Sequence, residues 1–369
     1  MIESLYVLIM TAIACSVIGV FLVLRNLAMI SDAISHSVLL GIVVAYFITK
    51  DITSIYLIIG AAVFGVLTCA CIEILAKTKL ITEDASVGII FPLFFSLAVI
   101  LITRYARNVH IDTDIVLMGE IILVPFTRFK LGFIDIPRSM FIMIVVFVAN
   151  MLFILVNFRK LKISTFDNVF AGAIGISTGI LYYTFMGMVS LTAVASFESV
   201  GAILTISFFI APAASAYLIT KDLKMTILVS MIYAIINSYI GFHLAVALNV
   251  SISGMCATVS GLTFLCTVLF YPKGIVTDLI SRRRKNRRFN KEMLVLHIGN
   301  HRNSEDRYKE LGISTMKDHV KWSGYRFNHY VKELINEGYI YENSKDNIYD
   351  LTEAGWQLKE KISTDYGLM

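Results

Sequence analysis

The chain has 369 residues, of which 57% are hydrophobic and 16% charged, and its formal net charge is +5 at pH 7. Because a soluble domain is about half apolar and a quarter charged, this composition and a mean hydropathy of +0.75 indicate a polytopic membrane protein and argue against a soluble one. The first apolar run, Met1–Leu24, has neither a basic leading region nor an A-x-A-like cleavage site, so we expect it to remain as a membrane span.

Apolar runs long enough to cross a bilayer recur along the first three quarters of the chain. Nine are expected, at residues 5–24, 27–48, 54–76, 86–103, 139–157, 173–194, 197–219, 225–247 and 252–271. Very little sequence separates 173–194 from 197–219, so a tight re-entrant turn there would reduce the count to eight. The predicted fold class is therefore an all-α polytopic membrane protein with eight or nine transmembrane helices.

Basic residues indicate how these spans are oriented. They gather after alternate apolar runs, at Arg25, Lys77, Lys79, Arg159, Lys160, Lys221, Lys224 and the run 282–285. Because such residues favour the cytoplasmic side, nine spans place the N-terminus outside and the C-terminus in the cytoplasm of a cell-membrane protein. The segment 104–138 carries both signs of charge and is expected on the outer side, partly along the membrane surface.

The second predicted span contains two ionisable residues, Asp32 and His36. Four positions apart on a helix, they lie on one face. Ionisable groups within a span are costly and usually line a pathway. A carboxylate oxygen and an imidazole nitrogen suit a divalent ion such as Mn²⁺, Zn²⁺ or Fe²⁺, whereas the alternative is a pair that only packs helices. Three serines add hydroxyls nearby: Ser31, Ser35 and Ser37.

A second informative stretch runs from Ser196 to Leu223. Glu198 is either a further metal ligand near the outer end of its span or a solvated acid at a helix start, where acids are favoured. Pro212 and the small residues after it predict a helix that breaks and turns before Lys221, exposing a short helix on the cytoplasmic face. In the next span, His243 is expected to face a cavity or a partner helix.

Near Tyr271 the chain becomes polar. We predict a transmembrane domain at 1–275, a basic juxtamembrane linker at 276–290 that anchors to lipid headgroups, and a small cytoplasmic domain at 291–369. Its pattern is three helical stretches (291–299, 304–319 and 323–338), a β-hairpin in YIYENSKDNIYDLT, and a capped amphipathic helix. This order predicts a winged-helix domain.

Two features of this tail leave their roles open. His297 and His301 stand four residues apart, which fits either a metal sensor or a core histidine pair. Tyr325, Arg326 and His329 would begin a recognition helix, but basic residues only modestly outnumber acidic ones from residue 281 onward. A protein-binding or regulatory role is therefore favoured over nucleic-acid binding.

Three separated stretches resemble signatures of the permease subunits of bacterial manganese/zinc/iron ABC importers, the metal ABC-3 family. They are VLRNLAMISDAISHSVLLGIVVAYF, STFDNVFAGAIGI and ESVGAILTISFFIAPAASAYLIT, and the resemblance spans about residues 5–275. It implies that Asp32 and His36 line the metal pathway and that Ala211–Lys221 forms the segment that docks onto the ATPase. Phe197 and Glu198 look more like the manganese-type branch than the zinc-type branch.

No G-x-x-x-x-G-K-[ST] motif occurs in the chain, so ATP hydrolysis is expected on a separate polypeptide and this chain is not expected to be an enzyme. The resemblance implies two permease subunits, identical or different, two ATPases, and an extracytoplasmic metal-binding protein. The metal is cargo, and no permanently bound cofactor is expected. The tail is similar to the winged-helix domain of metal-dependent repressors of the diphtheria-toxin-repressor type. The alternatives are an ion-coupled secondary metal transporter and a membrane-tethered winged-helix transcriptional regulator.

Overall fold

The structure is a computed structural model that describes residues 1–369 except 51–54, 106–120, 122–123, 132–133, 272–273 and 368–369. The chain divides into two units, Met1–Tyr271 and Pro272–Met369. They are described separately below.

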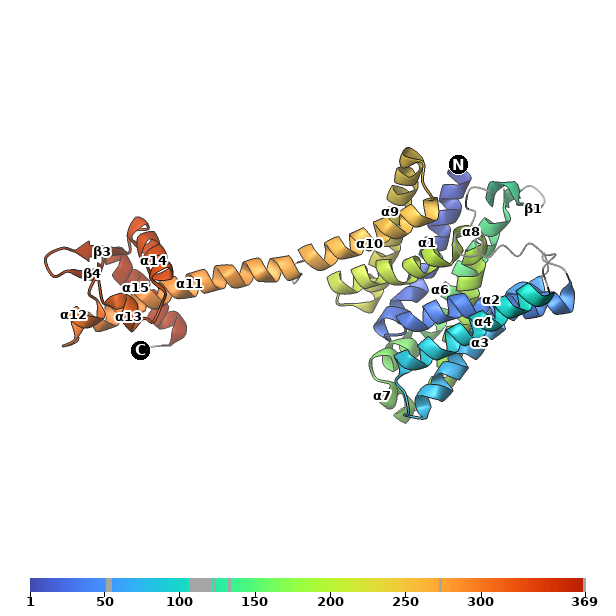
Figure 1. The fold of residues 1–369 in the computed structure, drawn as a ribbon, viewed down its shortest axis with the longest axis horizontal. Coiled ribbons are helices and arrows are strands. Elements are labelled where there is room, and N and C mark those ends of the chain that lie inside the picture. The colour runs from blue at the N-terminus through green and yellow to red at the C-terminus, as the bar shows by residue number, and fades with distance from the viewer. Residues whose placement is uncertain (51–54, 106–120, 122–123, 132–133, 272–273, 368–369) are drawn as a thin grey trace. The chain divides into compact units, whose positions relative to one another are not determined.

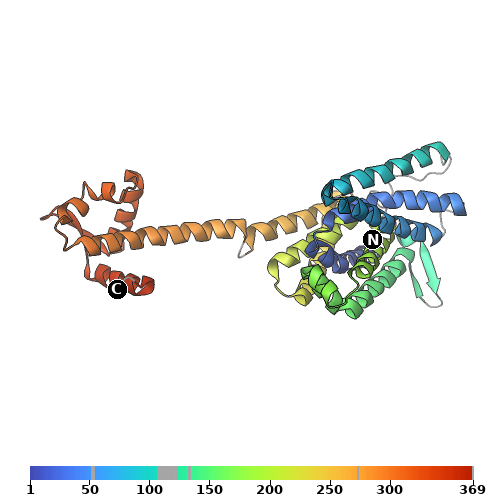
Figure 2. The same ribbon diagram turned by 90° about the horizontal axis from the view of Figure 1, so that it is seen from below.

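The first unit is a helix bundle (Figure 1), seen from below in Figure 2. Its helices are α1 (Ile2–Leu24), α2 (Ala28–Thr49), α3 (Ile55–Lys77), α4 (Glu83–Tyr105), α6 (Arg138–Phe166), α7 (Asn168–Ala173), α8 (Thr178–Ile219), α9 (Leu223–Leu248) and α10 (Ile252–Phe270). Within the described residues, nine helical segments are long and apolar enough to span a membrane, which confirms the expected number of apolar helices.

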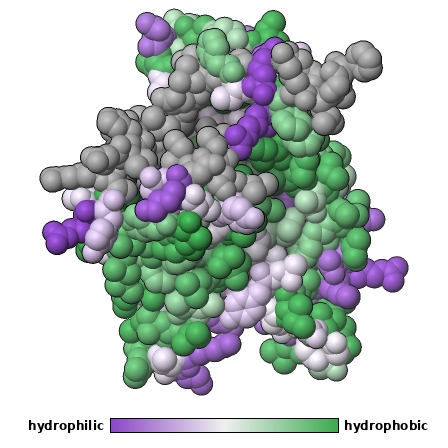
Figure 3. Space-filling view, turned by 90° about the vertical axis from the view of Figure 1, so that its right-hand side faces the viewer, coloured by the Kyte–Doolittle hydropathy of each residue, from purple (hydrophilic) through white to green (hydrophobic). Residues whose placement is uncertain are grey.

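The outside of this bundle is apolar where lipid would contact it. Hydrophobic residues cover much of the face in Figure 3. Along α6, exposed side chains follow one another on the side away from the core: Val145, Val148, Leu152, Leu155 and Val156. Because a soluble protein rarely exposes so large an apolar surface, this pattern fits a multi-pass membrane protein.

Helix α8 occupies the centre of the bundle and contains both the sixth and the seventh candidate spans. It is interrupted at Gly201, whose φ of 79° is a conformation that favours glycine. Before the break, Phe185 packs on Phe21 and Ser196 contacts Cys15 of α1. After the break, the chain comes back alongside Gly19 of α1. The contact is so close that a Cβ added at Gly19 would overlap the carbonyl of Phe209. The two halves of α8 therefore run in opposite senses along α1.

The predicted helix break at Pro212 is wrong. Pro212 lies inside the second half of α8, which continues to Ile219. A proline removes one backbone donor, but neighbouring helices make this tolerable in a membrane bundle. The turn comes instead at Gly201, eleven positions earlier, because only glycine reaches its backbone conformation without strain.

A small hairpin adds to the expected all-α fold. Between α4 and α6 lie the short helix η1 (Val124–Phe126) and the antiparallel strands β1 (Arg128–Leu131) and β2 (Ile134–Pro137). Arg128 pairs with Glu3 at 2.6 Å, which ties this hairpin to the start of α1.

The second unit has its own apolar core. Its elements are α11 (Ile275–His301), α12 (Arg307–Glu310), α13 (Met316–His319), α14 (Gly324–Asn336), β3 (Ile340–Asn343), β4 (Ile348–Leu351) and α15 (Glu353–Tyr366). The core residues come from every part of this order: Leu294, Ile298, Leu311, Phe327, Val331, Leu334, Ile340, Leu351 and Ile362.

Several tail predictions can be compared with this unit. The β3–β4 hairpin and the cap of α15, where the Thr352 hydroxyl accepts from the Gly355 amide at 3.1 Å, are confirmed. The stretch 304–319 forms two short helices rather than one, because Gly312 between them bridges to Ile348 as a short strand. The predicted linker 276–290 and the helix after it are one continuous helix, α11.

Candidate functional site

The helix that carries the ionisable pair starts immediately after α1. Asn26, at a φ of 59°, reverses the chain, and the amide of Leu27 donates to the carbonyl of Leu22 at 2.9 Å. This capped turn closes α1 and leaves only Arg25, Asn26 and Leu27 between the two helices. Any displacement of the end of α1 therefore reaches the start of α2 directly.

Asp32 and His36 lie one turn apart on α2, as predicted. The distance from Asp32 Oδ1 to His36 Nε2 is 3.6 Å, which is too long for a hydrogen bond. The side chains are 40% and 28% exposed, respectively, in a helix that is otherwise mostly buried. Neither is sealed into a helix-packing contact. The carboxylate and the imidazole therefore both remain partly accessible from outside the bundle.

The surroundings of this pair include residues that the sequence did not single out. The His36 ring lies against Phe91 and Phe95 of α4, with centroids 5.4 Å and 5.9 Å away. Met29, three positions before Asp32 on the same face, is 54% exposed. Its position on the Asp32 face was readable from the sequence, whereas the two phenylalanines required the packing of α4 on α2.

The three serines of α2 do not lie on the exposed surface that Asp32 and His36 share. Ser31, Ser35 and Ser37 are buried, and each hydroxyl donates to a backbone carbonyl of its own helix. Ser37 also accepts from Thr68 of α3 at 2.7 Å. These hydroxyls bond within the packed helices and do not join the partly exposed Asp32–His36 pair.

Glu198 lies in α8, and its side chain is outside the described part of the structure. Its position is three residues before the break at Gly201. His243 of α9 is exposed and lies edge-on to Tyr239, with ring centroids 4.5 Å apart. Among the described residues, no three His, Cys, Asp or Glu side chains gather as a metal site would require.

One end of the bundle, which we call the inner end, is defined by a cavity of about 540 Å³ lined by Arg25, Glu73, Lys77, Ser164, Thr165, Asn168, Thr178 and Tyr182. It is the end predicted to face the cytoplasm. Beside it, α7 is capped by Asp167, whose Oδ1 accepts from the amide of Phe170 at 2.8 Å. Val169 and Phe170 are 85% and 53% exposed. A short helix at this end thus presents unpartnered apolar side chains.

The second unit holds two further groups of ionisable residues. His301 pairs with Glu310, and His297 Nε2 lies 3.3 Å from the Glu310 carbonyl oxygen. Burial lowers the pKa of His297 below its ordinary value. These residues form a partly buried histidine pair, in keeping with a core role.

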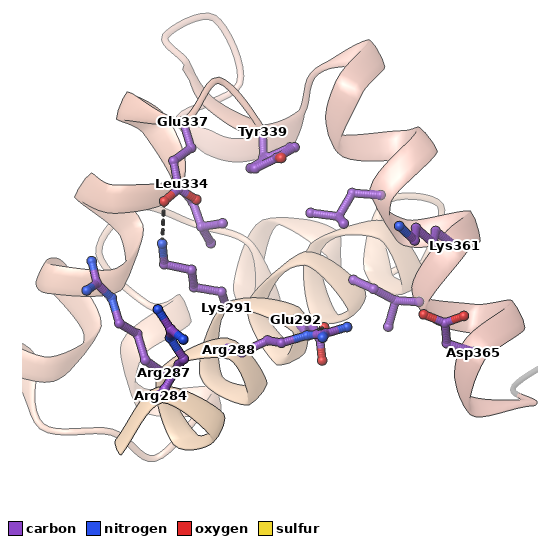
Figure 4. A pocket seen from close by; sticks show the side chains of 12 residues that line it. Arg284, Arg287, Arg288, Lys291, Glu292, Leu334, Glu337, Tyr339, Lys361 and Asp365 are labelled. Carbon is purple, nitrogen blue, oxygen red and sulfur yellow. Dashed lines mark hydrogen bonds and ion pairs between the residues drawn. The ribbon is translucent and has the colours of Figure 1, made fainter. Parts of the chain in front are cut away.

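The other group surrounds a cavity of about 500 Å³ between α11, α14 and α15 (Figure 4). Lys291 bonds to Glu337 at 2.5 Å, and Arg287 pairs with Glu333. Arg288 bonds to Glu292 at 2.6 Å. Three basic residues after the 282–285 run are therefore paired with acids of the same unit.

A bundle of long apolar helices with an open carboxylate–imidazole pair on one of them is the architecture of a multi-pass transport permease. Residues 1–271 match the ABC 3 transport family, and the chain belongs to that family. It is 41% identical to the manganese transport system membrane protein MntD of Bacillus subtilis, over 73% of this chain and 92% of that protein.

Two further comparisons show how much of the chain is similar to known proteins. The chain is 38% identical to the zinc transport system membrane protein TroD of Treponema pallidum over 339 residues, 92% of each protein. This match is longer than the first unit, so it extends into the second. Among solved structures, a chain of PsaBC from Streptococcus pneumoniae in complex with Fab is 28% identical, with a TM-score of 0.63 over 76% of this chain and 94% of that one.

Proposed function

We propose that this chain is the membrane permease of an ATP-binding-cassette importer that carries a divalent transition metal into the cytoplasm, with manganese favoured over zinc and iron. The observation that supports this most directly is the open Asp32–His36 pair in a chain of the ABC 3 family. A carboxylate and an imidazole together suit Mn²⁺ and Zn²⁺. Relatives named for manganese and zinc transport support the same class of cargo.

Two protein ligands are too few for a permanent metal site but suit an ion in transit. A resident zinc ion usually has four ligands, whereas conduction requires binding weak enough for release. We propose that water and a second permease subunit complete the coordination, with the two Asp32–His36 faces opposed. Met29 would lie one turn nearer the inner end of the same face, along the exit path.

Transport by this mechanism depends on partner chains. An extracytoplasmic metal-binding protein would deliver the ion, and a separate ATPase would drive the change of access. The test is uptake of radioactive Mn²⁺ and Zn²⁺ by cells that express the permease with and without its ATPase chain. Loss of uptake without the ATPase supports the importer, whereas full uptake would mean an ion-coupled secondary transporter.

We propose α7 as the main surface for the ATPase. The segment Ala211–Lys221, assigned this role from sequence, is largely buried up to residue 216, and it exposes Tyr217 and Ile219, by 53% and 37%, in the last turn of α8. In α7, by contrast, Val169 and Phe170 point away from the bundle core at the inner end. Apolar side chains on a short exposed helix are the pattern expected of a docking element.

For the second unit we propose a cytoplasmic winged-helix domain with a regulatory, protein-binding role. The order of helices, the β3–β4 hairpin and the Gly312–Ile348 bridge support this fold. The pairing of Arg287 and Lys291 with Glu333 on α14 leaves a weak basic footprint for nucleic acid. The test is fluorescence anisotropy of labelled duplex DNA with the full chain at low salt: nanomolar, sequence-dependent binding would favour the tethered regulator.

A further inference from the structure

Arg25 connects three helices at the inner end. It follows the last residue of α1, and its guanidinium reaches the end of α6, where Nε donates to Thr165 Oγ1 at 3.0 Å and Nη2 donates to Ser164 Oγ at 2.7 Å. The same group lies 5.2 Å from the centre of the Phe185 ring of α8. One side chain thus holds the start of the α1–α2 turn against the end of α6.

Arg25 is half-buried, and no carboxylate of the described residues pairs with it. Glu73, the acid that lines the same cavity, is bonded by Lys77 at 2.6 Å and by the Tyr183 hydroxyl. Burial lowers the pKa of Arg25, yet an arginine stays charged at neutral pH. A charge kept here without a counter-ion is a costly way to stabilise packing, because an apolar residue would avoid the desolvation.

A few residues connect the helices that Arg25 joins to the Asp32–His36 pair on one side and to helix α7 on the other. From Arg25, the capped turn leads into α2, and Asp32 lies about 6 Å along that helix from its first residue, Ala28. One residue separates Thr165 from Asp167, which directly follows the end of α6 and caps α7. The adjoining cavity of about 540 Å³ leaves space into which this junction could move.

We propose that Arg25 is a positioning residue that links the ATPase-docking helix α7 to the Asp32–His36 pair. This inference rests on the proposed function. A push on α7 displaces the end of α6, the two hydrogen bonds carry that displacement to Arg25, and the α1–α2 turn passes it to the metal-binding face. The planar guanidinium suits this role because it holds its donors in a rigid fork, whereas the lysine ammonium is a compact charge with rotatable donors on a flexible stem.

The experiment uses the complete transporter in vesicles and measures Mn²⁺ uptake and ATP hydrolysis in the same sample. We expect Arg25→Gln to keep ATP hydrolysis within about twofold and to lower the Mn²⁺ moved per ATP by about tenfold, the effect of losing one charge-assisted hydrogen bond. Arg25→Lys should lie between Arg25→Gln and the wild type. Arg159→Gln, the same change at an exposed arginine of α6, should leave the ratio unchanged.

A second variant removes the acceptors and leaves Arg25 in place. Ser164→Ala combined with Thr165→Val should reproduce the low ratio, which a merely structural role of Arg25 would not predict. A wild-type ratio in this double variant overturns the proposal, even if Arg25→Gln fails to fold. Failure of the proposed function would show separately, because vesicles with the wild-type permease would then take up no metal, and both proposals would fall.

Discussion

Removing the charge of Asp32 is the most direct perturbation of the proposed metal path. Asp32→Asn keeps the size of the side chain and removes one negative charge. Two unit charges 4 Å apart attract by ~1 kcal/mol in water and by ~4 kcal/mol at an effective dielectric constant of about 20. Since Asp32 is 40% exposed, its environment lies between these limits. A divalent ion doubles both values, so the loss is ~2 to ~8 kcal/mol.

Even the lower limit predicts a large effect on transport. At 1.4 kcal/mol per factor of ten, ~2 kcal/mol corresponds to about 30-fold weaker binding. The assay is the initial rate of radioactive Mn²⁺ uptake below saturation, with membrane abundance measured in parallel. Asp84→Asn, at an exposed acid in the first turn of α4, is the matched control and should transport normally. Unchanged uptake at normal abundance of Asp32→Asn would refute the metal-path assignment and leave the pair a packing feature.

Four other outcomes are expected. His36→Asp should raise the ratio of Mn²⁺ to Zn²⁺ uptake, because a second carboxylate suits manganese better than zinc. Val169→Asp should abolish co-purification of the ATPase, because a charge replaces an exposed apolar contact of α7. The second unit should lose stability as the pH falls below about 6.5, since the partly buried His297 takes up a proton more readily once unfolded. The chain's two tryptophans, both in this unit, report its melting by fluorescence. Gly19→Ala should lower membrane abundance by overlapping the α8 backbone, whereas Gly88→Ala, with open space around it, should not.

The helices of the bundle were predictable because the membrane restricts the options for the backbone. In lipid, each span must satisfy its own peptide groups, so an apolar run of sufficient length implies a helix. The order of elements in the tail was also readable, since the pattern alternates in the β3–β4 hairpin and has helical periodicity in α14. The Asp32–His36 pair followed from the same local geometry, because residues four apart on a helix share a face.

What the sequence did not reveal depends on contacts between distant segments. Pro212 was expected to break its helix, but the break lies at Gly201, where the chain reverses against α1. Phe91 and Phe95 reach His36 only through the packing of α4 on α2. The proposal of α7 in place of Ala211–Lys221 as the docking surface rests on the exposure of Val169 and Phe170, and exposure is a tertiary property.

The exposure of the Asp32–His36 pair and the contacts of Arg25 together support one mechanism for the proposed transport. In the proposed mechanism, the two-ligand face binds an ion without enclosing it, so a small displacement of α2 is enough to change which ligands the ion keeps. One route by which such a displacement can arrive from the inner end is the turn after α1, and Arg25 joins this turn to the end of α6. A mobile cargo and a remote ATPase require a connection of this kind between them, because a ligand or partner shifts an equilibrium only through contacts that differ between the two states.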